Sequence, residues 1–449
     1  MGVCGWLKKS KEEIKEIFDF CEGYKEFLNR SKTEREAVSC LRDLLLKSGF
    51  EEGKVGEKFF KVNRGKELIA FREGREGISS GLNIIVAHID APRLDLKQNP
   101  LYEDVDLALL RTHYYGGIKK YQWVTIPLAI HGTVVRSDGR HLDLVIGEDQ
   151  SDPVFSIDDL LPHLSKKVQD EKKAFEAVEG EKLVVLFGSM PLKGEEKEGV
   201  KKGILKLLSD SYGMTEDDFV SAEIEIVPAF KAQDVGLDRS MIGAYGQDDR
   251  ACAYPLVRAL LDACSPRRCC VAIFCDKEEI GSEGNTGMKS NFLKLFLYEL
   301  LEAFGVSPTD FALEKTLFNS KAISADVNGA INPAFQDVHE RQNACFLGHG
   351  VCISKYTGHG GKIGASDAHA EYVAKIRGLF DRENVIWQAA ELGKVDEGGG
   401  GTVAKYLAVH GVEIIDCGVP LLAMHSPFEI SSKLDVFETF RAYKVFLES

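Results

Sequence analysis

The sequence predicts an α/β fold in which a catalytic domain, formed by both ends of the chain, carries an inserted β-rich domain. Apolar runs typical of buried strands alternate with helix-favouring stretches on both sides of residues 98–235, which themselves consist of short alternating runs. Several of the buried runs end at His, Asp or Glu. Ligand sites of α/β proteins lie outside the carboxyl ends of the strands, so this arrangement predicts a metal-dependent active site.

Length and charge restrict the possible classes of protein. A chain of 449 residues is too long for one hydrophobic core and predicts at least two domains. We assign residues 1–97 and 236–449 to the catalytic α/β domain and residues 98–235 to the insertion. The net charge of −14 argues against nucleic acid or an anionic membrane as a partner.

Two further features predict a cytoplasmic location. The stretch Met1–Leu7 is too short for a signal peptide, and no apolar stretch reaches the roughly 20 residues of a membrane span. The 11 cysteines include no CxxC pair, and we interpret them as buried reduced thiols.

The first elements are two helices, expected over residues 10–30 and 33–48. The second opens with Thr33 and Glu36 at the spacing of a capping box. In the middle of the chain, alternating runs such as Trp123–Val135 and Leu142–Ile146 indicate strands. Two charged stretches that follow, Ser165–Lys182 and Lys193–Lys202, are expected as solvated faces or loops.

The first candidate site follows the apolar run 82–87. His88 and Asp90 are two residues apart, so on an extended backbone they point to the same side. An imidazole and a carboxylate placed in this way can serve as a metal ligand and as the group that orients it. The alternative is an ordinary polar strand end.

The second candidate is Asp248-Asp249, which follows a glycine-bearing turn and opens a helical stretch. Acidic residues are favoured at a helix start, so a simple cap is one interpretation. The other is that Asp248, with its two carboxylate oxygens, bridges two metal ions.

Glu278 and Glu279 form the sharpest signal, because two adjacent carboxylates after a buried strand repel each other unless a cation is near. A hydrolytic metal site needs one carboxylate as ligand and another to take a proton from water. We assign Glu279 to the metal and Glu278 to the general base.

Asp326 and His425 complete the set, each at the end of an apolar run. A mixture of imidazole and carboxylate ligands suits Zn²⁺, with Co²⁺ or Mn²⁺ as substitutes. His359 and His369 are rival ligands, for which we favour a structural or substrate-loop role.

Five segments together resemble, in order and spacing, the motifs of the aspartyl aminopeptidase family. They are Ala87-His88-Ile89-Asp90-Ala91-Pro92, Gln247-Asp248-Asp249, Asp276-Lys277-Glu278-Glu279-Ile280-Gly281-Ser282, Ile323-Ser324-Ala325-Asp326 and Ala423-Met424-His425-Ser426. The resemblance covers nearly the whole chain. It implies a di-zinc exopeptidase fold with a central mixed sheet, an inserted oligomerisation domain and a tetrahedral dodecamer. It also implies metal ligands at His88, Asp248, Glu279, Asp326 and His425, with Asp90 and Glu278 catalytic.

Three further positions follow from the resemblance alone. His163, in Leu161-Pro162-His163-Leu164, is the candidate for a histidine that enters a neighbouring subunit's active site. Lys355 resembles a lysine near the substrate's acidic side chain, and Gly398–Gly401 resembles a glycine-rich loop beside the active site. The segment Lys119–Val124 departs from the family's pattern, which makes a strict acidic preference doubtful.

The expected reaction is zinc-dependent hydrolysis of an N-terminal peptide bond, with peptides as substrates and a preference for Asp or Glu. Two zinc ions per subunit would activate a water, and Glu278 would accept its proton. A donor such as His163 would help to stabilise the oxyanion. The alternatives are an aminopeptidase of broader or neutral specificity, another di-zinc amidohydrolase of the aminoacylase or carboxypeptidase type, and a non-catalytic assembly protein.

Overall fold

The computed structural model describes residues 3–449, and contacts within it divide the chain into two compact units. Unit 1 comprises the chain up to Ala91 together with Ala232–Met424 and Phe428–Ser449. Unit 2 comprises Pro92–Lys231 and His425–Pro427. The mixed α/β class, with a β-rich part inserted into a catalytic part, is confirmed. Within residues 3–449, no helix is both long and apolar enough to cross a membrane.

Unit 1 is built on a nine-stranded mixed sheet. Its middle strands β14, β4, β15 and β19 run parallel, whereas β2, β3 and β17 include antiparallel pairings. In spatial order the strands are β1 (Glu51–Glu52), β2 (Lys58–Asn63), β3 (Glu67–Arg72), β14 (Cys269–Cys275), β4 (Leu82–His88), β15 (Lys321–Ser324), β19 (Glu413–Gly418), β17 (Val351–Ser354) and β18 (Trp387–Ala389).

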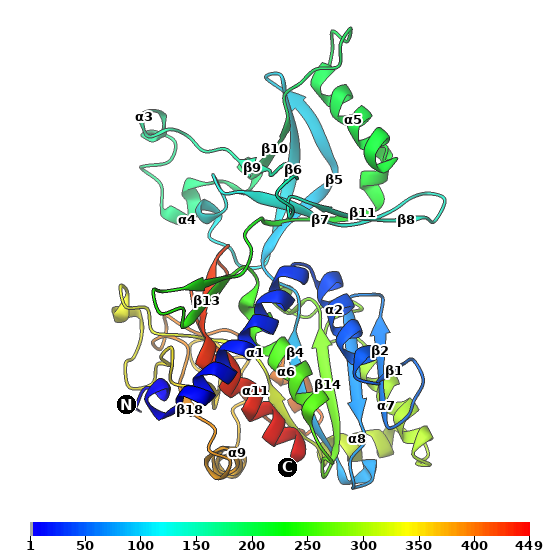
Figure 1. Ribbon diagram of the computed structural model, residues 1–449, viewed down its shortest axis with the longest axis vertical. Coiled ribbons are helices and arrows are strands. Elements are labelled where there is room, and N and C mark those ends of the chain that lie inside the picture. Colours follow the sequence, from blue (N-terminus) through cyan, green and yellow to red (C-terminus); the bar gives the residue numbers. More distant parts are fainter. Residues whose placement is uncertain (1–2) are drawn as a thin grey trace. The chain divides into compact units, whose positions relative to one another are not determined.

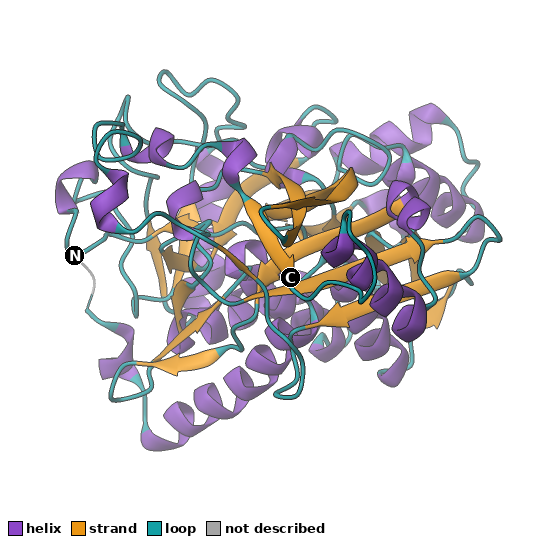
Figure 2. Ribbon diagram, turned by 90° about the horizontal axis from the view of Figure 1, so that it is seen from above, coloured by secondary structure: helices purple, strands orange, loops and turns teal. Residues whose placement is uncertain are grey.

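Helices cover both faces of this sheet, because successive side chains of each buried strand point to opposite faces and both sets are apolar (Figures 1 and 2). One face, with Ile85 and Ala272, packs against α1 (Lys11–Arg30), α2 (Glu34–Lys47), α6 (Gln247–Asp262), α9 (Ala370–Arg382) and α11 (Lys433–Glu448). The other, with Ile84 and Val271, packs against α7 (Phe292–Ala303), α8 (Asp310–Phe318) and α10 (Ala404–Ala408).

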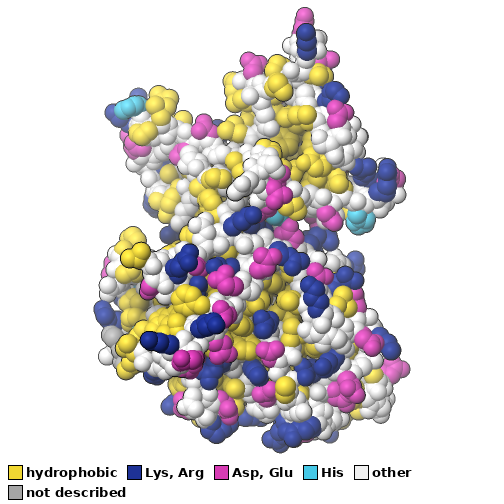
Figure 3. Space-filling model, viewed as in Figure 1, with side chains coloured by type: hydrophobic (Ala, Val, Ile, Leu, Met, Phe, Trp, Pro, Cys, Tyr) yellow, Lys and Arg dark blue, Asp and Glu magenta, His cyan; other side chains and the backbone are white. Residues whose placement is uncertain are grey.

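Local signals agree with the helix starts. Ser10 and Thr33 each form a capping box, with Glu13 and Glu36 respectively. The predicted helices at 10–30 and 33–48 are therefore confirmed to within a residue or two. Figure 3 shows acidic and basic side chains interspersed on the visible face of unit 1.

A second, five-stranded sheet in unit 1 supports the start of α6. Its order is β12 (Gln233–Val235), β13 (Met241–Ala244), β21 (Glu429–Ser432), β20 (Pro420–Leu422) and β16 (Asn328–Gly329). β13 leads directly into α6, and β21 pairs beside it. A short 3-10 helix, η6 (Glu278–Ile280), follows β14.

Unit 2 contains a seven-stranded antiparallel sheet. Its order is β8 (His141–Ile146), β7 (Leu128–Val135), β11 (Ala222–Pro228), β5 (Arg93–Asp104), β6 (Leu107–Tyr115), β10 (Val184–Gly188) and β9 (Ser156–Ile157). Three helices accompany it: α3 (Pro162–Ser165), α4 (Ala174–Ala177) and α5 (Gly199–Tyr212).

The strand expected over Trp123–Val135 begins only at Leu128. A 3-10 turn over Lys120–Gln122 comes before it, and Thr125 has a positive φ of 60°. Trp123 is fully buried in this irregular segment. The apolar residues before Leu128 therefore pack into the core without forming a strand, which is why the predicted strand was too long.

Candidate metal centre

Possible metal donors gather at the carboxyl edge of the central sheet. His88 is the last residue of β4, Glu279 lies in η6 after β14, and Asp326 follows β15. Because these three strands run parallel, their carboxyl ends open at the same edge. Asp248 and Asp249 join them at the start of α6. Strand direction therefore brings together residues that are far apart in the sequence.

These residues form two overlapping groups. One contains His88, Asp248 and Glu279, and the other contains Asp248, Asp249 and Asp326. Within each group, one donor atom of every residue lies within 4.8 Å of the others. Asp248 belongs to both groups, as a carboxylate that bridges two ions must.

His88 is buried and held from both sides of its ring. Its Nε2 lies 3.1 Å from Oδ1 of Asp248. Its Nδ1 lies 3.1 Å from the carbonyl oxygen of Asp90 and 3.2 Å from a carboxylate oxygen of the same residue. Burial alone would lower the pKa of His88, but the hydrogen bonds with Asp248 and Asp90 raise it well above its usual value.

Asp90 also fixes the turn that carries the two glutamates. Its two carboxylate oxygens accept hydrogen bonds from the backbone N–H groups of Glu278 and Glu279, both at 3.1 Å. The turn is tight, with positive φ at Lys277 and Gly281. The buried carboxylate of Asp90 thus orients both the imidazole of His88 and the backbone of Glu278 and Glu279.

Both the types of donor residue and their burial fit a zinc site. Among residues 3–449, no group donates a hydrogen bond of normal geometry to either carboxylate oxygen of Asp249, although the residue is fully buried. Burial raises the pKa of Asp249 well above its usual value, and burial together with Asp249 does the same for Asp326. Clustered, buried carboxylates of this kind need a cation to be stable as anions. An imidazole with carboxylates is a set that zinc accepts.

Sequence reasoning missed two residues of this region. Asp249 is in the second group, although only Asp248 of the pair had been assigned to metal. Glu429, on β21, is buried, and its Oε2 accepts hydrogen bonds from the backbone N–H groups of Gln247 at 2.5 Å and Asp248 at 3.2 Å. Glu429 therefore holds the start of α6 in place. Adjacency to Asp248 was a signal for Asp249, whereas Glu429 had none.

His425 lies in neither group. It belongs to the short stretch His425–Pro427 of unit 2, with a positive φ of 64°. Its Nδ1 donates a hydrogen bond to the carbonyl oxygen of Gly117 at 2.8 Å. A carbonyl can only accept, so in the neutral ring Nδ1 carries the proton and Nε2 carries the lone pair.

Lys355 directly follows β17, which runs antiparallel to β19. It therefore leaves the sheet in the opposite direction from the residues that follow β4 and β15. Its Nζ forms an exposed ion pair with Asp367 at 2.6 Å. The resemblance places Lys355 near an acidic side chain of the substrate. In the structure its ammonium group is instead paired with Asp367 of the same chain.

The remaining unit 1 candidates lie in loops. His359 and His369 are in neither donor group. The backbone N–H of Gly358 donates to the carbonyl oxygen of Gly400 at 2.6 Å, and a Cβ at Gly399 would lie 2.0 Å from the carbonyl oxygen of Gly358. Glycine at position 399 is thus required by the close approach of two loops.

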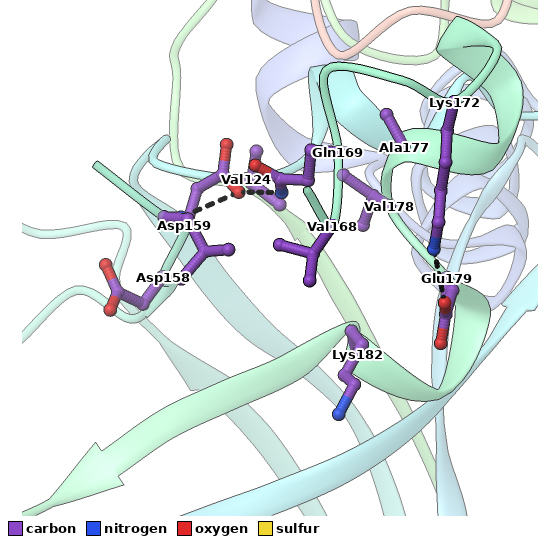
Figure 4. A pocket seen from close by; sticks show the side chains of 11 residues that line it. Val124, Asp158, Asp159, Val168, Gln169, Lys172, Ala177, Val178, Glu179 and Lys182 are labelled. Atoms are coloured by element: carbon purple, nitrogen blue, oxygen red, sulfur yellow. Dashed lines mark hydrogen bonds and ion pairs between the residues drawn. The ribbon is translucent and has the colours of Figure 1, made fainter. Parts of the chain in front are cut away.

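In unit 2, His163 lies on α3 and is exposed, between exposed Leu161 and Leu164. Asp158, Asp159 and Leu160, which precede α3 in the sequence, help to line a pocket of about 440 Å³ (Figure 4). Within this pocket Gln169 donates to Asp159 at 2.6 Å, and Lys172 pairs with Glu179 at 2.7 Å. Of the charged residues that line it, Lys172 and Glu179 thus form an ion pair, and Asp159 accepts from a neutral amide.

Comparison with known proteins supports a single family. The family model described as aminopeptidase I zinc metalloprotease (M18) matches residues 27–447. A probable M18 family aminopeptidase 1 of Thermotoga maritima is 51% identical, over 99% of this chain and 98% of the relative. The crystal structure of an M18 aminopeptidase from Thermotoga maritima superimposes with a TM-score of 0.96 at 50% identity, covering 100% of this chain and 99% of that one.

A more distant likeness concerns the fold alone. A structure described as the mApe1 dodecamer of S. cerevisiae superimposes with a TM-score of 0.76 at 20% identity. It covers 95% of this chain and 96% of the other.

Proposed function

The chain belongs to the M18 family of zinc aminopeptidases, and from this premise we propose that it removes N-terminal residues from peptides at a two-zinc centre with Glu278 as general base. As an M18 enzyme it is a hydrolase of the exopeptidase class. This membership confirms the predicted family, and the carboxypeptidase and non-catalytic alternatives are set aside. The observation that carries the proposal is the pair of donor groups that share Asp248.

Five residues would hold the ions: His88, Asp248, Glu279, Asp326 and His425. Asp248 would be shared, and Asp249 is a further donor beside Asp326. When bound, zinc supplies a Lewis acid that lowers the pKa of water and polarises the scissile carbonyl.

Glu278 suits proton transfer because it lies outside both donor groups yet is fixed next to Glu279 by Asp90. It accepts a proton from the water as the water oxygen attacks the carbonyl carbon. It then returns that proton to the leaving nitrogen as the C–N bond breaks, releasing the amino acid and the shortened peptide. Asp90 acts as a positioning residue, through His88 and the glutamate turn.

We further propose a preference for acidic N-terminal residues, carried by Lys355. An ammonium group facing the side-chain pocket would favour Asp or Glu over neutral residues. A second candidate, neutral or broad specificity, is favoured by the ion pair between Lys355 and Asp367, which already neutralises the ammonium. The departure at Lys119–Val124 points in the same direction.

We also propose that the chain forms a tetrahedral dodecamer in the cytoplasm, in which His163 enters a neighbouring subunit's active site. Exposure of His163 between apolar Leu161 and Leu164 supports this, because such a segment is better covered by protein than by water. The assembly of the yeast relative is the precedent. If His163 acts across an interface, mixing inactive Glu278→Gln and His163→Phe subunits restores activity. No recovery after confirmed subunit exchange contradicts action in trans.

The proposed reaction is tested by metal analysis and a matched substrate pair. Elemental analysis should find two zinc ions per chain, and chelation should abolish activity that zinc or cobalt restores. Peptides with a free N-terminus should be cleaved, whereas their N-acetylated forms should not. Cleavage of both forms at equal rates contradicts the exopeptidase proposal.

A further inference from the structure

A cavity of about 460 Å³ lies in unit 1 at the amino ends of the central strands, at the sheet edge opposite the metal centre. Asn83, the second residue of β4, lies at its base, and its Nδ2 donates to the carbonyl oxygen of Phe446 on α11 at 3.0 Å. Five cationic side chains line this cavity, which we call the basic pocket: Arg267, Arg268, Lys321, Lys375 and Arg382.

These cations come from separate elements that packing brings together. Arg267 and Arg268 precede β14, Lys321 opens β15, and Lys375 and Arg382 lie on α9. In Figure 1, α9 and the C-terminal end of α11 lie at the lower edge of unit 1, where Figure 3 shows lysine and arginine side chains. Such a concentration stands out in a chain whose net charge is −14.

Acidic groups also lie around the basic pocket, and some of them are already engaged. Glu76 pairs with Arg267 at 2.6 Å and lies 4.0 Å from Arg268. Two carboxylate side chains line the pocket, Glu383 and Glu448, and Glu448 already accepts a hydrogen bond from the backbone of Cys264. Ser449 lines it as well, and its main-chain oxygen accepts a hydrogen bond from Nδ2 of Asn83 at 3.1 Å. Glu413 opens β19 beside Lys321.

The other three cations, Lys321, Lys375 and Arg382, form no ion pair within residues 3–449. Partial burial and the neighbouring charges of Lys321 and Arg268 lower the pKa of Lys375 to about 8. Like charges held this close destabilise each other, and an anion between them removes the repulsion.

We propose that the basic pocket binds a small phosphate-type oxyanion, either free phosphate or the phosphate group of a small phosphorylated molecule. Arginine forks and lysine ammonium groups are the side chains that recognise such groups. The volume lies in the range of small-ligand sites. The pocket is separate from the metal centre, since its residues begin the strands that the metal donors end.

The test is calorimetric titration of the zinc-loaded protein with inorganic phosphate and, separately, with glycerol phosphate, at constant ionic strength set with chloride. We expect one saturable site per chain. In Lys375→Gln/Arg382→Gln the Kd should rise by about 100-fold or more, since each of the two lost charge-assisted contacts is worth about 10-fold or more. Both substituted side chains are exposed, so the variant should fold.

Lys15→Gln/Lys47→Gln is the matched control, because it removes the same charge from exposed positions on α1 and α2. Its Kd should equal that of the wild type. Tighter binding of glycerol phosphate identifies a phosphorylated molecule as the ligand class, and equal or weaker binding identifies free phosphate; both support the site. No saturable binding, or equal weakening in the control, overturns it.

Two more measurements separate this pocket from the metal centre. Binding that is lost in His88→Ala but kept in Lys375→Gln/Arg382→Gln would place the anion on zinc and overturn the proposal. At pH 8 the anion should also cause uptake of about half a proton, because it raises the pKa of Lys375. That uptake should vanish in Lys375→Gln, and its persistence there would count against the pocket.

Discussion

β4, β14 and β15 begin among cations and end among acids. At their amino ends, Arg268 and Lys321 line the basic pocket, and at their carboxyl ends His88 and Asp326 belong to the donor groups. At the carboxyl edge Asp90, Asp248 and Asp249 are buried and Glu279 and Asp326 are half-buried, whereas at the amino edge the cations are all half-buried or exposed. The difference teaches that burial, rather than charge alone, distinguishes a centre built for chemistry from one suited to reversible binding.

The largest effect should come from the carboxyl edge. Glu278→Gln keeps the shape of the side chain but cannot accept a proton, so kcat should fall by about 10²-fold or more. Zinc content should not change, because Glu278 lies outside the donor groups. Glu283→Gln, an exposed position in the same loop, is the control and should keep its activity. Near-wild-type turnover in Glu278→Gln would contradict the assignment of Glu278 as the general base.

Asp90→Asn should have the next largest effect. The amide of Asn has one acceptor oxygen and no negative charge. It cannot accept hydrogen bonds from the backbone of both Glu278 and Glu279 and also act as the anionic partner of His88, so zinc affinity or activity should fall by about 10- to 100-fold. Zinc titration followed by rate measurement at saturating metal separates the two losses. Unchanged affinity and rate would show that burial of Asp90 serves stability alone.

Lys355→Ala sharpens the comparison, since Lys355 follows β17, which runs antiparallel to β19. If it faces the substrate, kcat/KM for Asp and Glu substrates should fall by roughly 10-fold, with little change for Leu. Asp367→Ala should act in the opposite sense by freeing the ammonium. Equal effects on Asp and Leu anilides would support the neutral-specificity candidate.

The smallest effect concerns stability within the sheet. Burial raises the pKa of Asp416, on β19, to about 6 from 3.8. The folded state then holds this proton more tightly than the unfolded chain, so the contribution to stability is present below pH 3.8 and is lost as pH rises through about 6. Asp416→Asn should therefore raise Tm above pH 6 and change it little below pH 4. The upper bound is about 3 kcal/mol.

Thermal melts of Asp416→Asn and the wild type across pH 4–8 give this difference directly. A constant difference in Tm at all pH values would show that Asp416 does not titrate on unfolding.

The carboxyl edge was largely readable from the sequence, because a buried strand that stops at a ligand residue marks one edge of a parallel sheet. His88, Glu279 and Asp326 meet for this reason, and Asp248 joins them from the start of α6. Glu429 was not readable, since its role depends on β21 pairing with β13 far away in the chain. The basic pocket was hidden too, because Lys375 and Arg382 look like ordinary surface residues of a helix until α9 packs beside the strand starts.

The strand order of the central sheet has a consequence for synthesis. β4 lies between β14 and β15, so a strand from the first part of the chain is hydrogen-bonded on both sides to strands made much later. At about 5–20 residues per second, β4 waits on the order of ten seconds or more on the ribosome for its partners. During that time its apolar side chains are exposed to chaperones and to other nascent chains. Unit 2 is formed almost entirely by one continuous segment of the chain, so it can fold within this interval. The part of the nascent chain most prone to aggregation during expression is therefore the incomplete unit 1.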